Sequence, residues 1–279
     1  MSKNRKNRLS KLQKQLRPAM VVLACLVVGG ILWLYRDKPA LTDSVLPGPS
    51  QKVEDRPRAT GDKAGRSPNF DKDQYSVDDP TSLWAVVNKG RKLPADYVPA
   101  SQGSPNVMKK SSGILLRFAA VSQLESLFAA AHKSNLRLVL VSGYRSYSTQ
   151  SSLYAGYVAR DGQAMADTYS ARPGHSEHQT GLAADIGGSS RTCELEQCFG
   201  GTAEGKWLAD NSYEYGFVIR YKKGQEKLTG YSYEPWHLRF VGVQLAAQIQ
   251  KNGQTLEQFF GLPAFPIYTE DPYRLSANR

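Results

Sequence analysis

The 279-residue chain contains only three cysteines, Cys25, Cys193 and Cys198, and only four histidines. So few cysteines exclude a disulfide-stapled mini-protein and a cysteine-rich zinc module, so a metal site would have to use histidine and carboxylate. Acidic residues are absent from the first seventeen positions, which carry seven of the eleven net positive charges. Because this basic excess is confined to one end and is not spread over a folded face, the composition argues against nucleic-acid binding.

The segment after the basic end, residues 18–35, has no charged residue and could form a helix across most of a ~30 Å hydrocarbon layer. We expect an uncleaved, single-pass membrane anchor, with residues 1–17 as a cytoplasmic tail and the rest of the chain outside the cell. The alternatives are a cleaved signal peptide, whose apolar region is usually shorter, and a lipoprotein signal ending at Cys25. Apolar residues continue past that cysteine, which disfavours lipidation there.

The rest of the chain divides by composition. Residues 36–80 are rich in proline, glycine, serine and charged residues and lack apolar periodicity, which predicts a disordered extracytoplasmic linker. The folded domain is expected over residues 81–265, and residues 266–279 are expected to form a tail.

Helices and short strands interleave in the folded domain without a βαβ rhythm or an internal repeat. This order favours an α+β fold with an antiparallel sheet over a doubly wound parallel sheet. Hydrophobic periodicity and stop signals place the elements. Strands are expected over residues 136–142, 217–221 and 231–240, and helices over 113–133, from beyond 150 to about 160, and over 162–169, 202–215 and 243–251.

Two short segments, one ending at Asp185 and one ending at His237, contain three of the four histidines together with several carboxylates. Zn²⁺ is held well by imidazole and carboxylate, and a catalytic zinc site uses three protein ligands and one open position. His178, Asp185 and His237 would supply those three ligands. Glu234, three residues before His237, would then be placed to take a proton from a bound water.

Spacing alone leaves a second interpretation open. Pro235 excludes the helical H-E-x-x-H motif, and the first two candidate ligands are seven residues apart. On this interpretation His175 and His178 are solvated loop residues, and His237 is a hydrogen-bonded residue of a strand. Glu177 is expected to be solvated in either case.

The string Ser176-Glu-His-Gln-Thr-Gly-Leu-Ala-Ala-Asp185 resembles the S-x-H-x-x-G-x-A-x-D signature of the VanY-like D-alanyl-D-alanine carboxypeptidases and LdcB-like L,D-carboxypeptidases, the M15 zinc peptidases. The stretch Val141–Gln150 looks like the upstream substrate-binding segment of that family. Tyr233–Arg239 looks like its downstream catalytic box. The resemblance covers about residues 84–261.

This resemblance implies a carboxypeptidase that holds one zinc ion and removes the C-terminal D-alanine from peptidoglycan stem peptides, and the predicted anchor would tether this enzyme to the membrane. By residue-to-residue match it implies that His178, Asp185 and His237 bind the zinc and that Glu234 is the general base. It also implies a Hedgehog/DD-peptidase-type fold, an antiparallel sheet flanked by helices.

The resemblance assigns substrate contacts as well. Arg145 matches the substrate-binding arginine of the family, and its planar fork could bind a free carboxylate or steady the developing oxyanion. Gln150 and Ser176 match polar residues that bind the terminal residue of the substrate. His175 is expected at the rim of the site, and Cys193 and Cys198 are expected to form a local disulfide.

Two alternatives to this function are carried forward. One is an L,D-carboxypeptidase that acts on tetrapeptides. The other is a catalytically silent cell-wall-binding module, which would be free to lose its base, so the presence of Glu234 argues for the enzyme.

Overall fold

The computed structural model describes residues 70–277. The predicted cytoplasmic tail and membrane anchor, and most of the predicted linker, lie outside the described residues. Within the described part, no helix combines the length and the apolar character needed to span a membrane.

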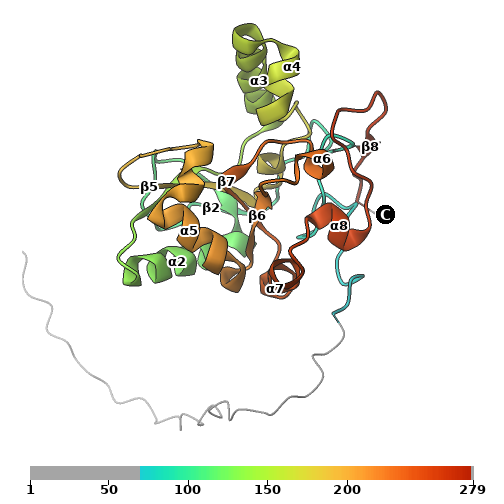
Figure 1. Cartoon of the computed structure of the whole chain (residues 1–279). Helices are drawn as coiled ribbons and strands as arrows, with labels where there is room; N and C mark the ends of the chain where they lie inside the picture. Colours follow the sequence, from blue (N-terminus) through green and yellow to red (C-terminus); the bar gives the residue numbers. More distant parts are fainter. Residues whose placement is uncertain (1–69, 278–279) are drawn as a thin grey trace, which may run out of the picture. The chain divides into compact units, whose positions relative to one another are not determined.

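A four-stranded sheet forms the centre of the fold (Figure 1). Every pairing in it is antiparallel, which confirms the predicted α+β class with an antiparallel sheet. Two of its strands, with the sequences LVLVS and FVIRY, are rich in apolar and β-branched residues, which favour β structure. In spatial order they are β4 (Leu138–Ser142), β5 (Ala183–Gly188), β7 (Glu234–Phe240) and β6 (Phe217–Tyr221).

One face of the sheet packs against α2 (Phe118–Lys133) and α5 (Ala203–Asn211). The apolar positions of α2 recur at helical spacing, so Leu124, Leu127 and their neighbours form one buried stripe. This stripe meets alternate residues of β4, β5 and β7 in the main core. Alternate residues of a strand point to opposite faces, so the other residues of β5 and β7 are directed to the second face of the sheet.

The second face carries a helical hairpin, α3 (Tyr147–Asp161) and α4 (Gln163–Tyr169). In Figure 1 this hairpin stands above the sheet, whereas α2, α5 and α7 (Val243–Asn252) lie below it. A second core joins Trp84 to α7 and α8 (Leu256–Phe260), and the indole Nε1 of Trp84 donates a 2.9 Å hydrogen bond to the carbonyl of Val241.

The remaining elements are short. They comprise β1 (Arg91–Lys92), β2 (Gln102–Gly103), β3 (Leu116–Arg117), β8 (Tyr273–Arg274), α6 (Glu226–Thr229) and the 3₁₀ helices η1 (Glu177–Thr180), η2 (Gln197–Gly201) and η3 (Ser212–Tyr215).

Several predicted boundaries differ from the structure. The helix expected from residue 113 begins at Phe118, because the two residues before it pair with β2. The helix expected over residues 202–215 is α-helical only to Asn211 and continues as η3. The strand expected from residue 231 begins at Glu234.

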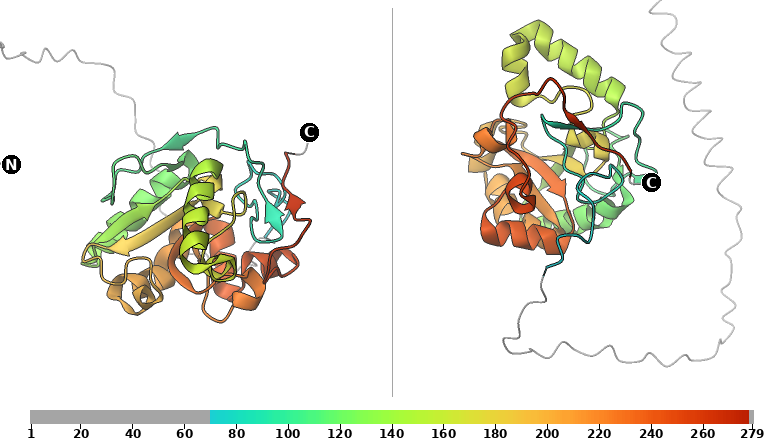
Figure 2. Two further views of the ribbon diagram at one scale, coloured as in Figure 1. Left: turned by 90° about the horizontal axis from the view of Figure 1, so that it is seen from above. Right: turned by 90° about the vertical axis from the view of Figure 1, so that its right-hand side faces the viewer.

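The chain ends of the domain are packed, contrary to the predicted boundaries. Phe70 stacks on Trp84 with 5.4 Å between ring centroids, so packing begins before residue 81. In the predicted tail, β8 pairs with β1, as the left view of Figure 2 shows, and Leu275 is fully buried. Composition predicts a tail here because the contacts that order this segment come from residues nearly two hundred positions away, which local sequence does not reveal.

Candidate active site

Sheet register brings two of the predicted ligands together. Asp185 of β5 and His237 of β7 are directly paired residues on neighbouring strands. Their neighbours Ala184, Ile186 and Leu238 belong to the main core. Because side chains alternate along a strand, Asp185 and His237 both face the opposite side of the sheet.

The third predicted ligand, His178, lies in η1, just before β5. Gly181 ends η1 with a φ of +69°, a left-handed conformation that favours glycine, and its N–H donates to the carbonyl of His178. That carbonyl also accepts a 3.1 Å hydrogen bond from the backbone N–H of Arg145, and His178 Nδ1 lies 2.7 Å from the carbonyl oxygen of Gly143. These bonds fix η1 to the segment that follows β4.

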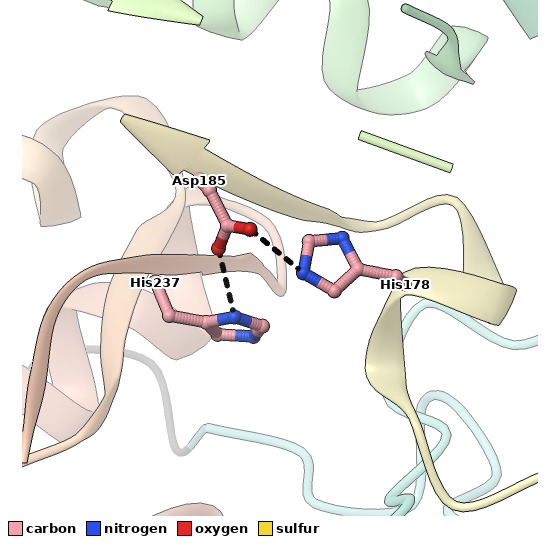
Figure 3. Close-up of side chains that lie close together, drawn as sticks. All are labelled: His178, Asp185 and His237. Atoms are coloured by element: carbon pink, nitrogen blue, oxygen red, sulfur yellow. Dashed lines mark hydrogen bonds and ion pairs between the residues drawn. The ribbon is translucent and has the colours of Figure 1, made fainter. Parts of the chain in front are cut away.

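The three side chains meet around the carboxylate of Asp185 (Figure 3). Its Oδ2 lies 3.1 Å from His178 Nε2, and its Oδ1 lies 3.1 Å from His237 Nδ1. The two imidazole rings are nearly perpendicular, with 5.0 Å between their centroids. All three residues are buried.

The donor chemistry of this cluster fits a metal ion. His178 Nδ1 faces a carbonyl, which only accepts, so in the neutral ring Nε2 carries the lone pair. His237 has a carboxylate oxygen beside each ring nitrogen, that of Glu177 at 3.4 Å from Nε2 and that of Asp185 at 3.1 Å from Nδ1, and the neutral ring that donates Nε2–H to Glu177 carries its lone pair on Nδ1. In that tautomer two nitrogen lone pairs and the Asp185 carboxylate converge within 4.8 Å, an arrangement that can hold a metal ion.

A proton and a metal ion would compete for the Nδ1 atom of His237. Burial lowers the pKa of His237, but the hydrogen bonds that the protonated ring donates to the Asp185 and Glu177 carboxylates outweigh burial and raise that pKa to about 9. Binding a metal at Nδ1 would therefore displace a proton, so metal affinity is expected to rise with pH.

Glu234, the first residue of β7, stands beside the cluster with its Oε2 3.9 Å from His237 Nδ1. Burial raises the pKa of Glu234 from its ordinary 4.5 to about 8, the charge of Asp185 acts in the same direction, and His237 opposes both. A nearby dication would lower this pKa towards neutrality. A carboxyl that titrates near neutral pH suits proton transfer.

Arg145 is held against the cluster by polar partners. Its Nη1 donates a 2.8 Å hydrogen bond to Gln150 Oε1, and its Nη2 donates a 3.0 Å bond to Ser142 Oγ. Gln150 is itself oriented, because its Nε2 donates to the carbonyl of Ala171. The guanidinium lies 4.0 Å from Asp185 Oδ2.

A single cleft of about 260 Å³ contains every side chain that the sequence singled out for the site. Its apolar wall comes from the α3–α4 hairpin, from Tyr221, Tyr231 and Trp236, and from Leu195 beside the predicted Cys193–Cys198 disulfide, which is formed. The predicted residues that line the cleft are Arg145, Gln150, Ser176, His178, Asp185, Glu234 and His237.

Two histidine-segment predictions were wrong. His175 is not at the rim: it is buried, and its Nδ1 lies 2.8 Å from the carbonyl of Asn88. Glu177 is not solvated: its side chain is fully buried and is paired with Arg220 and Arg239. The signal for Glu177 lay elsewhere in the sequence, because an arginine within an apolar strand needs a buried anion.

Comparisons with known proteins agree with this geometry. The family described as VanY, D-alanyl-D-alanine carboxypeptidase, matches residues 113–243. The chain is 44% identical over 189 residues to YodJ of Bacillus subtilis, a protein assigned as a carboxypeptidase, with 66% of this chain and 69% of YodJ covered.

Two solved structures are similar as well. The LdcB LD-carboxypeptidase has a TM-score of 0.62 and 45% identity, over 65% of this chain and 87% of that one. A VanY D,D-pentapeptidase variant from a VanB-type resistance cassette, in complex with Zn(II), has a TM-score of 0.52 and 32% identity, over 62% of this chain and 96% of that one.

Proposed function

This chain belongs to the VanY family of carboxypeptidases, and from that premise we propose that it is a zinc-dependent D-alanyl-D-alanine carboxypeptidase that trims peptidoglycan stem peptides. The observation that carries the proposal is the convergence of His178, Asp185 and His237 beside Glu234 in one cleft. The proposed extracytoplasmic location rests on the predicted membrane anchor over residues 18–35.

The proposed zinc ligands are His178 Nε2, a carboxylate oxygen of Asp185 and His237 Nδ1. A zinc ion bound there would act as a Lewis acid and lower the pKa of water. Glu234 accepts the proton of the attacking water and later delivers it to the leaving amine of the terminal residue. Its buried position suits both steps, because burial keeps its pKa far above that of a solvated carboxyl.

Arg145 is the proposed anchor for the terminal carboxylate of the substrate. Among the described residues its hydrogen bonds to Gln150 and Ser142 use two of the five guanidinium N–H groups, and the others are available for a bidentate contact. An internal peptide bond offers no such carboxylate and would leave these N–H groups without a partner from the substrate. The cleft therefore favours removal of a terminal residue over internal cleavage.

A second candidate is L,D-carboxypeptidase activity on tetrapeptides. The observation that favours it is the likeness to LdcB, whose identity of 45% exceeds the 32% of the D,D-pentapeptidase. The two activities differ in the configuration of the residue before the scissile bond, so the site chemistry is the same and only the cleft wall would distinguish the substrates.

The test is mass spectrometry of stem pentapeptide and tetrapeptide digests with the purified full chain. We expect loss of one D-alanine, abolition by a chelator and recovery on addition of Zn²⁺. Glu234→Ala should lower turnover by about 10²–10⁴-fold while zinc stays bound. Glu270→Ala, a change at an exposed glutamate outside the cleft, is the matched control.

Each outcome of this experiment has a distinct meaning. D-alanine release from the pentapeptide alone supports the D,D assignment, and release from the tetrapeptide alone supports the L,D assignment. Near-normal turnover by Glu234→Ala would contradict the role of the base. No hydrolysis of either peptide by the zinc-loaded wild type would contradict the enzyme assignment.

A further inference from the structure

Glu177 lies between two buried arginines and a proposed metal ligand. Its Oε1 accepts 2.8 Å hydrogen bonds from Arg220 Nε and from Arg239 Nη1. Its other oxygen, Oε2, lies 3.4 Å from His237 Nε2. The side chain of Glu177 has no exposed surface, so water does not compete for these contacts.

We propose that Glu177 is a positioning residue for the metal site: it accepts a hydrogen bond from Nε2–H of His237 and so keeps the lone pair of Nδ1 directed at the metal. This inference rests on the proposed zinc site and extends it to a residue that touches neither metal nor substrate. Carboxylates that hold the second nitrogen of a ligating imidazole fix both its tautomer and its ring orientation.

The two arginines determine which oxygen of Glu177 meets the imidazole. Arg239 is fixed by Nη2 hydrogen bonds to the carbonyls of Leu83 and Ala85, at 3.0 and 2.8 Å. Arg220 is fixed by a two-point contact with Glu257, at 3.0 and 2.6 Å. Because both guanidinium groups meet at Oε1, the carboxylate is held against rotation and Oε2 is left for His237.

The four charged side chains of this network add no net charge beside the proposed metal site. Glu177 and Glu257 carry two negative charges and Arg220 and Arg239 carry two positive charges, all buried. The network is therefore neutral as a whole, and it acts on the proposed metal site by orienting the imidazole of His237. On a neighbouring side, the ring of Tyr221 packs against His237 with 5.0 Å between centroids and further restricts the imidazole.

Glu177→Gln is the decisive variant, because it keeps the shape and changes the pattern of donors. The two arginines hold the amide oxygen at the Oε1 position, so the amide NH₂ faces His237 Nε2. That nitrogen must then accept a hydrogen bond, which moves the ring proton to Nδ1 and removes the ligand lone pair.

Glu257→Gln is the matched control. Glu257 is equally buried and belongs to the same network, but its side-chain partners are Arg220 and Asn88 and include no proposed ligand. Both changes remove one buried negative charge beside Arg220. A purely structural network would make the two variants alike.

The readout is zinc affinity, measured on the full chain by competition with a chromophoric chelator, together with the visible absorption spectrum of the Co²⁺-substituted protein. We expect Glu177→Gln to weaken zinc binding by about 10–100-fold and to change the Co²⁺ spectrum. Glu257→Gln should leave both nearly unchanged. Equal losses in the two variants, or no loss in Glu177→Gln, would overturn the inference.

A measurement on the wild type keeps the inference testable if Glu177→Gln fails to fold. In the zinc-loaded protein with ¹⁵N-labelled histidine, His237 should show a protonated Nε2 and a metal-bound Nδ1. A metal-bound Nε2 would refute the positioning role. Absence of zinc binding by the wild type would instead refute the proposed function, so the two failures are distinguishable.

Discussion

Replacement of Arg145 by glutamine, combined with removal of the charge on the substrate terminus, gives the sharpest test of substrate recognition. The side chain is 19% exposed and is held by Gln150 and Ser142, so a carboxylate bound to it would be largely removed from water. Loss of one partner of such a buried, hydrogen-bonded ion pair costs about 2–5 kcal/mol. We therefore expect Arg145→Gln to lose about 3–4 kcal/mol of transition-state binding, which is about 10²–10³-fold in kcat/KM.

The assay is a double-mutant cycle between enzyme and substrate. Wild type and Arg145→Gln are each given a stem peptide that ends in D-alanine and the same peptide ending in D-alaninamide, and kcat/KM is measured for all four combinations. The wild type should prefer the free acid by about 10²–10³-fold, and the variant should lose most of that preference. Arg160→Gln, a change at an exposed arginine of α3, controls for the loss of a positive charge.

The cycle separates the two roles that the sequence left open for Arg145. If the guanidinium binds the terminal carboxylate, the two changes are strongly coupled, because either one alone removes the same ion pair. If it steadies the developing oxyanion, Arg145→Gln slows both peptides by the same factor and the preference for the free acid persists. That second result would refute the carboxylate-anchor assignment.

Three further predictions concern the fold around the site. Burial lowers the pKa of His175 from its ordinary 6.5 to about 4. The unfolded chain therefore binds this proton first, so the free energy of unfolding is unaffected above pH 6.5 and falls by about 3 kcal/mol as the pH drops towards 4. His175→Gln should therefore flatten the acid decline of the free energy of unfolding measured in urea, and an unchanged slope would count against this account. Cys193 and Leu195 have φ near +59° in the disulfide loop, and Leu195 lines the cleft, so the disulfide holds this part of the cleft wall in place. Replacing both cysteines by serine should therefore raise KM more than it lowers kcat in steady-state kinetics. An unaffected KM would exclude a role for the loop in substrate binding. Leu275→Ala should cost about 2–5 kcal/mol in the same urea titration, because this side chain is fully buried, whereas a loose tail would show no change.

The residues that form the candidate metal site were predictable from sequence, but the buried side chains that surround them were not. The sequence motifs predict that His178, Asp185 and His237 converge, and in the structure these three side chains lie together. Glu177 lies inside the same motif, and the prediction that it is solvated is wrong because its side chain is fully buried. Its partners Arg220 and Arg239 are 43 and 62 residues away, and nothing local distinguishes a buried glutamate from an exposed one.

The same limit explains the misplaced ends of the domain. Composition predicted a linker up to residue 80 and a tail from residue 266, because neither stretch shows apolar periodicity. Phe70 and Leu275 are single apolar residues in polar surroundings, and each is packed by residues distant in the chain. Periodicity detects an element with a continuous apolar face, and it misses isolated side chains that complete a core.

Sheet register connects the core to the chemistry. Asp185 and His237 face each other because β5 and β7 pair in one register, and a slip of one residue on either strand would turn its ligand towards the α2 core. Such a slip is opposed because the apolar neighbours on the strand that moves, Ala184 and Ile186 on β5 or Leu238 on β7, would leave the core at the same time. The hydrophobic alternation on one face of the sheet therefore fixes the spacing of the two proposed ligands on the other. The positions of Asp185 and His237 are consequently set by folding itself, and the third proposed ligand, His178, depends on its hydrogen bonds to the segment after β4.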